Sequence, residues 1–231
     1  MSLASFIRRV RKRIDRIRLT PIRIYCIHEV SESYNPATTW ESDWVQIDDF
    51  KAKIERLREG NEFISLPEAY GHIAHDIIRR KRYCVLTCDD GASSIKSILP
   101  WLSERGISIT LFVNPAILEG KEKREKPMEL LSVSELHTLY NDYSPVITVG
   151  NHGYSHLDSG MISMKEFEDN VERSEEFLSR EFPDRIPFFA YPLNGHNGQT
   201  DMYLRSKGII PVYCDGNSNY GDAGIVHREL L

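Results

Sequence analysis

The sequence of residues 83–91 is Tyr-Cys-Val-Leu-Thr-Cys-Asp-Asp-Gly, and this stretch decides the fold. Its first six residues are apolar or β-branched at both alternating sets of positions, which predicts a strand buried on both faces. Such strands are typical of parallel sheets, because the connecting helices cover both faces of the sheet. The two aspartates and the glycine mark the point where this strand ends and the chain turns.

Similar runs recur along the whole chain. We expect further strands at 22–28, 62–66, 108–114, 146–152, 186–192, 209–214 and 224–230. Segments with helical periodicity separate most of them, at about 47–59, 67–81, 93–105, 132–141, 163–181 and 197–207. Ser132 with Glu135, and Ser163 with Glu166, have the spacing of a capping box, which predicts the start of two helices.

The alternation of strands and helices predicts an α/β fold. Neither GxGxxG nor GxxxxGK[ST] follows the early strands, which disfavours a nucleotide-binding open sheet. We therefore expect residues 21–231 to form a closed barrel of seven or eight parallel strands with helices outside. In such barrels the chemistry lies at the carboxyl ends of the strands.

The composition is that of one globular domain. The chain has 231 residues, of which 41% are hydrophobic and 27% charged, enough for one sizeable core. Its net charge of −5 disfavours nucleic-acid binding. The four cysteines have no CxxC pair and fall in apolar runs, so we expect reduced core residues: Cys26, Cys84, Cys88 and Cys214.

Residues 1–20 differ from the rest of the chain, because they carry seven basic residues against one acidic residue. Ile7, Val10, Ile14 and Ile17 recur among them at helical spacing. This pattern predicts a basic amphipathic helix that either packs on the domain or contacts anionic lipid peripherally. Neither a signal-peptide pattern nor a membrane-spanning apolar stretch is visible, which predicts a cytoplasmic location with possible contact at the inner membrane.

Polar residues with metal-binding chemistry stand at the ends of predicted strands. Asp89 and Asp90 end one strand, and His152 ends another, with His156 four residues later. A carboxylate and two imidazoles, with solvent completing the shell, are the ligand set of an open hydrolytic zinc site. We expect one aspartate to bind the metal and the other to accept a proton from the water that the metal activates.

Each of these motifs has a simpler explanation when it is taken alone. Asp-Asp-Gly after a strand is a common turn, and an aspartate before Ser93 and Ser94 would cap the next helix. Two histidines four residues apart on a loop are usually solvated. Their combination at one predicted barrel mouth is what favours a metal site over these explanations.

At these residues the sequence resembles the polysaccharide deacetylases, carbohydrate esterase family four. The resemblance extends in order over about residues 22–230. Two segments resemble the upstream part of one branch of the family: 24–28 and 63–70. The first block of the family is matched by residues 87–91 and 109–113, its metal-binding histidine block by residues 150–156, and its third block by residues 189–192.

The resemblance implies a distorted (β/α) barrel of about seven parallel strands with helices outside. Such a barrel would hydrolyse an N-acetyl amide of a carbohydrate, or less often an O-acetyl ester, with a divalent metal, for which zinc is favoured. Asp90, His152 and His156 would bind this metal. Asp89 would be the base. The backbone N–H of Tyr191 would stabilise the oxyanion alongside the metal.

Three further residues complete the expected site. Pro192, next to Tyr191, and His28, at the end of the first strand, would lie against the substrate. His227 would be the general acid that protonates the amine leaving group. Arg228 is the alternative residue that faces the barrel mouth at this point of the chain.

Two departures from the family pattern bear on activity. Cys88 stands where the first block usually has Phe, and Arg185 is the nearest counterpart of an arginine that orients the base in many members. A non-catalytic or weakly active descendant that binds metal or glycan is therefore one alternative, although such a protein has little use for Asp89. The other alternative is a hydrolase of another small C–N amide bond, but the first strand offers only His28 where paired-metal barrels usually need His-x-His.

Overall fold

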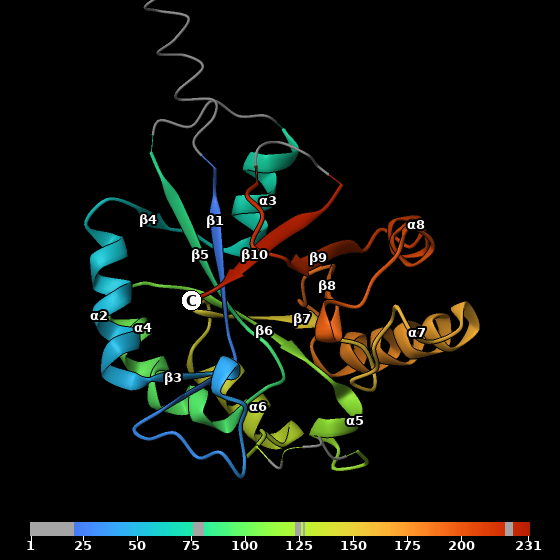
Figure 1. The fold of residues 1–231 in the computed structure, drawn as a ribbon, viewed down its shortest axis with the longest axis horizontal. Helices are drawn as coiled ribbons and strands as arrows, with labels where there is room; N and C mark the ends of the chain where they lie inside the picture. The colour runs from blue at the N-terminus through green and yellow to red at the C-terminus, as the bar shows by residue number, and fades with distance from the viewer. Residues whose placement is uncertain (1–20, 76–80, 123–125, 127, 220–223) are drawn as a thin grey trace, which may run out of the picture.

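A computed structural model describes residues 21–75, 81–122, 126, 128–219 and 224–231 (Figure 1). The basic amphipathic helix predicted for residues 1–20 lies outside the described residues. None of the helices within the described ranges combines the length and the apolar character needed to cross a membrane.

Seven parallel strands form a closed barrel, as the sequence predicts. The ring closes because β1 pairs with β10 on one side and with β5 on the other. A short strand, β4 (Glu62–Phe63), pairs with the first residues of β5 and stays outside the ring. In chain order the strands of the ring are β1 (Arg23–Ile27), β5 (Tyr83–Cys88), β6 (Ile109–Val113), β7 (Ile147–Asn151), β8 (Phe188–Ala190), β9 (Ile210–Cys214) and β10 (Val226–Leu230).

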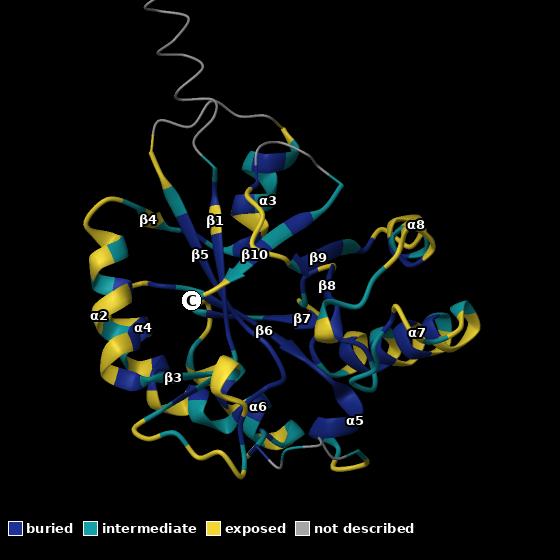
Figure 2. Ribbon diagram, in the orientation of Figure 1, coloured by how far each residue is buried: buried dark blue, intermediate teal, exposed yellow. Residues whose placement is uncertain are grey.

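Helices surround this ring, and Figure 2 shows buried strands inside and exposed helix faces outside. Both predicted capping boxes are confirmed. The side chains of Ser132 and Ser163 accept hydrogen bonds from the backbone N–H groups of Glu135 and Glu166. The side chains of these glutamates accept hydrogen bonds from the backbone N–H groups of the serines. The helices are α2 (Ile47–Arg58), α3 (Leu66–Ala74), α4 (Leu99–Glu104), α5 (Pro115–Leu118), α6 (Val133–Asp142), α7 (Met164–Glu181) and α8 (Gly198–Ser206).

Two local predictions differ from the structure. The helix predicted over 93–105 is divided into a 3₁₀ helix, η2 (Ser93–Ser97), and α4. Pro100 lies in the first turn of α4, where its missing N–H is tolerated, so a new helix begins there. The second difference is a two-stranded parallel sheet of β2 (Glu29–Ser31) and β3 (Trp44–Gln46), whose strands are too short to show a period.

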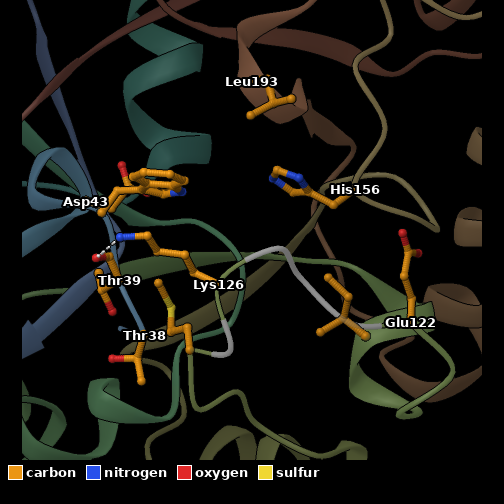
Figure 3. A pocket seen from close by; sticks show the side chains of 10 residues that line it. Thr38, Thr39, Asp43, Glu122, Lys126, His156 and Leu193 are labelled. Carbon is orange, nitrogen blue, oxygen red and sulfur yellow. Dashed lines mark hydrogen bonds between the residues drawn. The ribbon is translucent and has the colours of Figure 1, made fainter. Parts of the chain in front are cut away.

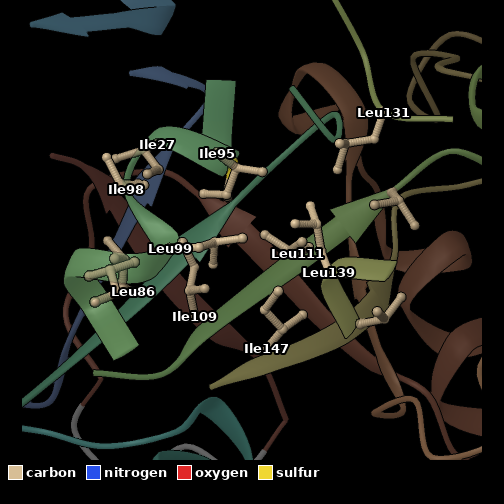
Figure 4. Close-up of a cluster of buried hydrophobic side chains, with 14 of the residues drawn as sticks. Ile27, Leu86, Ile95, Ile98, Leu99, Ile109, Leu111, Leu131, Leu139 and Ile147 are labelled. Carbon is tan, nitrogen blue, oxygen red and sulfur yellow. The ribbon is translucent and has the colours of Figure 1, made fainter. Parts of the chain in front are cut away.

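The core has an outer layer between the strands and the helices and an inner layer that fills the barrel. Figure 4 shows the outer layer, in which side chains such as Leu86 and Leu111 meet those of the helices. Phe112 is fully buried and belongs to the inner layer. A Cβ atom at Gly150 on the adjacent strand would lie 2.5 Å from the Phe112 ring, so glycine is required there. The barrel is therefore a filled core, and ligands can reach only its rim.

Candidate metal centre and active site

Three side chains converge on one point at the carboxyl ends of β5 and β7. His156 Nε2 lies 3.1 Å and His152 Nε2 lies 3.4 Å from Asp90 Oδ1. Asp90 and His152 are buried, and His156 is partly exposed. Burial by itself would raise the pKa of Asp90, but hydrogen bonds from the two histidines hold it well below its usual value. The sequence prediction that these three residues come together is confirmed.

The backbone turn after β5 explains how two successive aspartates reach the same mouth. Asp90 has φ +69° and Gly91 has φ +74°, both in the left-handed region. Aspartate tolerates this region better than most residues, at a cost of about 1–2 kcal/mol. Because the chain turns at Asp90, its carboxylate is directed to the mouth rather than to the opposite face of the sheet.

The geometry of these residues fits a divalent metal. His152 Nδ1 lies 2.7 Å from the Ala190 carbonyl oxygen and donates to it, so Nε2, which faces Asp90, is the nitrogen that a metal would take as its ligand. Ligands about 2.1 Å from a tetrahedral zinc lie about 3.4 Å from one another, close to the separations found here. A second group that includes Cys26, His28 and Asp89 fits less well, because Asp89 is held by an arginine.

That arginine is Arg228 of β10, which forms a two-pronged ion pair with Asp89. The Nη1–Oδ1 distance is 2.7 Å and the Nη2–Oδ2 distance is 2.8 Å. Arg228 also donates to Thr87 Oγ1 and to the Tyr213 carbonyl oxygen, and it is completely buried. Burial would raise the pKa of Asp89, but the guanidinium charge outweighs this and holds the pKa at about 2. Asp89 is therefore ionised and fixed in orientation.

Arg228, and not Arg185, is the arginine that contacts Asp89, the predicted base. Arg185, the nearest counterpart in sequence, pairs instead with Glu175 of α7. The alternation of β10 shows why Arg228 faces inward, since Val226 and Arg228 are both buried while the residue between them is not. Sequence analysis named Arg228 as facing the mouth but gave it no partner, because Asp89 lies 139 residues away along the chain.

His227 points away from this site, contrary to its predicted role as general acid. It lies on the opposite face of β10 from Arg228, where its Nδ1 is 2.9 Å from Asp215 Oδ2 and its ring contacts the edge of Tyr213. It is not among the residues that line the cavity beside the metal ligands. The predicted role of His227 therefore has no support in this geometry.

His28 lies in that cavity, which has a volume of about 170 Å³ and is also lined by Asp89, His152 and His156. His28 Nδ1 is buried and has no hydrogen-bond partner among the described residues. His28 thus lies beside the candidate metal ligands, and its contact with the substrate stays a prediction. A buried imidazole nitrogen with no protein partner is also available to exchange a proton with a ligand.

Tyr191 lines the same cavity, but its polar groups are already engaged. Its N–H donates to the Val212 carbonyl oxygen at 3.2 Å, and its hydroxyl donates to Asp201 at 2.9 Å. The predicted oxyanion contact of the Tyr191 N–H would require the first of these bonds to break. Pro192 is buried and begins the 3₁₀ helix η3 (Pro192–Asn194), without lining the cavity itself.

None of the four cysteines, all of which lie within the described residues, is joined in a disulfide bond. Cys26, Cys84 and Cys88 are buried, and Cys214 is partly exposed at the wall of the cavity. Cys88, which replaces the usual Phe of the first block, packs in the outer layer of the core rather than at the mouth. This substitution therefore leaves the metal-binding residues unchanged.

The sequence model of the family described as Polysaccharide deacetylase matches residues 77–212, which include Asp89 and all three candidate metal ligands. The chain belongs to the polysaccharide deacetylase family. Members of this family are metal-dependent hydrolases that cleave amide C–N bonds to release acetyl groups from carbohydrates, and this deacetylase has the metal-binding triad in place.

Solved structures share the fold of this deacetylase. IcaB from Ammonifex degensii has a TM-score of 0.77 at 24% identity, with 92% of each chain covered. The Streptococcus pyogenes deacetylase PplD, in complex with acetate, has a TM-score of 0.75 at 17% identity, covering 91% of this chain and 92% of that one. A de-N-acetylase from Aggregatibacter actinomycetemcomitans has a TM-score of 0.76 at 12% identity, covering 91% and 94%. No curated protein matches the sequence.

Proposed function

We propose that this polysaccharide deacetylase is a zinc-dependent N-deacetylase in which Asp90, His152 and His156 hold the metal and Asp89 is the base. The observation that carries the proposal is the convergence of three ligand atoms beside a buried carboxylate that an arginine keeps ionised. Two neutral imidazoles and one carboxylate favour zinc and leave coordination positions for solvent and substrate. A metal bound there would polarise the acetyl carbonyl group and make a water molecule acidic.

Asp89 accepts the proton of the attacking water. Asp89 lines the cavity beside His152 and His156. Two hydrogen bonds from Arg228 fix the orientation of its carboxylate. A carboxylate with a pKa of about 2 is a weak base, so it needs a water molecule that is already acidic. The ion pair with Arg228 therefore makes the role of Asp89 dependent on a metal bound at the triad.

His28 donates a proton to the leaving amine. An amine is a poor leaving group until it is protonated, so the site needs an acid. His28 is suited to this role because it lines the same cavity as Asp89, whereas His227 does not. Its unpaired Nδ1 would be satisfied by the substrate or by a water molecule.

The ion pair of Asp89 with Arg228 also bears on the alternative of a non-catalytic descendant. In the sequence, that alternative was suggested by departures from the family pattern, among them the base-orienting arginine, whose nearest counterpart is Arg185. Arg228 now supplies the arginine, and His28 supplies an imidazole in the cavity. Catalysis is therefore the function that the site supports best.

The test measures acetate release from N-acetylated oligosaccharides by metal-stripped protein to which zinc is added back. We expect Asp89→Asn to keep the metal and lose turnover by about 10²–10⁴-fold, and His152→Ala to lose both metal and turnover. His28→Gln is expected to keep the metal and lower kcat. His137→Ala, on the outer face of α6 where His137 pairs with Glu181, is the matched control. Full activity in both Asp89→Asn and His152→Ala would show that the site assignment is wrong.

A further inference from the structure

Figure 3 shows the side chains that line a second cavity, which has a volume of about 220 Å³. The two cavities share Asp43, His156 and Leu193 in their walls, so they are contiguous. The second cavity extends from His156 to residues 38–43, which lie between β2 and β3. Its volume is below the roughly 300 Å³ at which sites for drug-sized ligands begin, so it has room for about one sugar ring.

One wall of this second cavity comes from residues 38–43, and Lys126 holds that wall in place. Lys126 Nζ donates to the carbonyl oxygens of Pro36 and Thr39 at 2.8 and 2.9 Å. The same ammonium lies 3.9 Å from the centre of the Trp40 ring. Trp40 is thus fixed by a cation–π contact on one face, yet the residue remains 47% exposed.

Exposed apolar side chains gather at the rim of the two cavities. Large exposed hydrophobic residues among the described part of the chain are Trp40, Met161, Leu193, Met202 and Leu230. Trp40 and Leu193 line the second cavity, and Leu193 and Leu230 line the first. Single exposed apolar residues need no explanation, but their grouping around a metal-binding mouth indicates a binding surface.

Leu193 is also held in a strained backbone conformation. Its φ of +54° lies in the left-handed region, which costs a non-glycine residue of order 1–3 kcal/mol. The next residue, Asn194, has φ +55° and accepts a hydrogen bond from the Cys214 N–H at 2.8 Å, which fixes the turn against β9. Leu193 is 69% exposed, so burial of its side chain does not offset this strain.

We propose that Trp40 and Leu193 determine specificity by holding the sugar residue next to the one that loses its acetyl group. This inference rests on the proposed N-deacetylase function. A sugar ring has C–H faces that pack on Trp40 and Leu193, and hydroxyl groups that hydrogen-bond to Asp43. Glu122, whose Oε2 is buried without a hydrogen-bond partner among the described residues, offers a further acceptor in the same cavity. The preferred substrate is therefore a chain of at least two sugars.

The experiment compares N-acetylglucosamine with its β-linked dimer, trimer and tetramer. We expect kcat/KM per acetyl group of the wild type to rise at least ten-fold from monomer to dimer. Leu193→Gly keeps the backbone conformation without strain, and we expect it to lose most of this rise through a higher KM while its melting temperature stays the same or increases. Trp40→Ala should lose the rise as well.

Met161→Ala and Met202→Ala are matched controls, because these residues are as exposed as Leu193 but line neither cavity. A binding measurement makes the test independent of turnover: Asp89→Asn, loaded with zinc, should bind the dimer more tightly than the monomer, and this difference should shrink when Leu193→Gly is added. An unchanged dimer-to-monomer ratio in Leu193→Gly would overturn the inference. Absence of acetate release from every sugar would instead overturn the proposed function.

Discussion

At the scale of single residues, the buried pair of Asp89 and Arg228 is the decisive feature of the site. Both partners are nearly inaccessible to water, and the guanidinium satisfies both carboxylate oxygens. Such pairs add little net stability compared with apolar replacements, but removing one partner leaves a buried charge unpaired. The pair is therefore retained for orientation and charge at the site rather than for stability.

This argument predicts the stability of variants of the pair. Arg228→Met should lower the free energy of unfolding by about 3–5 kcal/mol, because Asp89 is left charged and buried. Asp89→Leu/Arg228→Met should recover most of that loss while remaining inactive. Urea denaturation measures both values. Lys81→Met, which breaks the exposed pair with Glu62, is the control and should change stability by about 1 kcal/mol or less. A loss of the same small size in Arg228→Met would contradict the argument.

The lowered pKa of Asp89 predicts how stability depends on pH. The folded-state pKa of about 2 lies below the ordinary value, so the ionised pair stabilises the fold fully above about pH 4. This contribution, about 2 kcal/mol, is lost as the pH falls from about 4 toward 2. Urea titrations of metal-free protein at pH 6, 4 and 3 should show a steeper loss for the wild type than for Asp89→Leu/Arg228→Met. Parallel curves would show that the pair does not titrate as described.

At the scale of elements, the packing of neighbouring strands inside the barrel limits which residues are tolerated. Gly150 of β7 lies against the ring of Phe112 of β6, and the two residues pair in register. His152 follows two positions later, directly after the last residue of β7. A shift of β7 away from β6 would therefore also displace a metal ligand.

Gly150→Ala is expected to destabilise the protein by about 1–3 kcal/mol, since its Cβ would lie 2.5 Å from a ring that cannot easily move in a close-packed core. Gly150→Ala/Phe112→Leu should recover part of the stability. Gly71→Ala in α3 is the control, because no atom lies within 4 Å of the position that its methyl group would take and alanine favours helix. Thermal unfolding would measure all three, and equal stability of Gly150→Ala and wild type would contradict the packing argument.

At the scale of the whole molecule, closure of the ring brings together residues that are far apart in the chain. Arg228 of β10 reaches Asp89 after β5 because β1 lies between these strands and pairs with both. Sequence patterns predicted the seven strands of the ring, since strands buried on both faces are marked by continuous apolar runs. The strand predicted over 62–66 was mostly wrong, because only Glu62–Phe63 form a strand, outside the ring, and α3 begins at Leu66. They also predicted that Asp90, His152 and His156 meet, because the ends of parallel strands share one mouth.

What the sequence did not predict depends on contacts across the chain. The orientation of His227 follows from which face of β10 turns inward, and the partner of Arg228 follows from ring closure. Neither is visible in a local pattern. The sequence also did not predict the wall of the second cavity formed by residues 38–43. The reason is that the flanking strands, β2 and β3, are only three residues long and are separated by a loop.

Residues 29–82 connect β1 to β5, which are neighbouring strands of the ring. This connection contains Trp40 and Asp43. The metal ligands, in contrast, follow strands of the ring itself. Trp40, which we propose contacts the neighbouring sugar, therefore lies outside the segments that carry the metal ligands, whereas Leu193 follows β8 of the ring. Substitutions between β2 and β3 are therefore expected to change the preference for the neighbouring sugar without moving the residues that hold the metal.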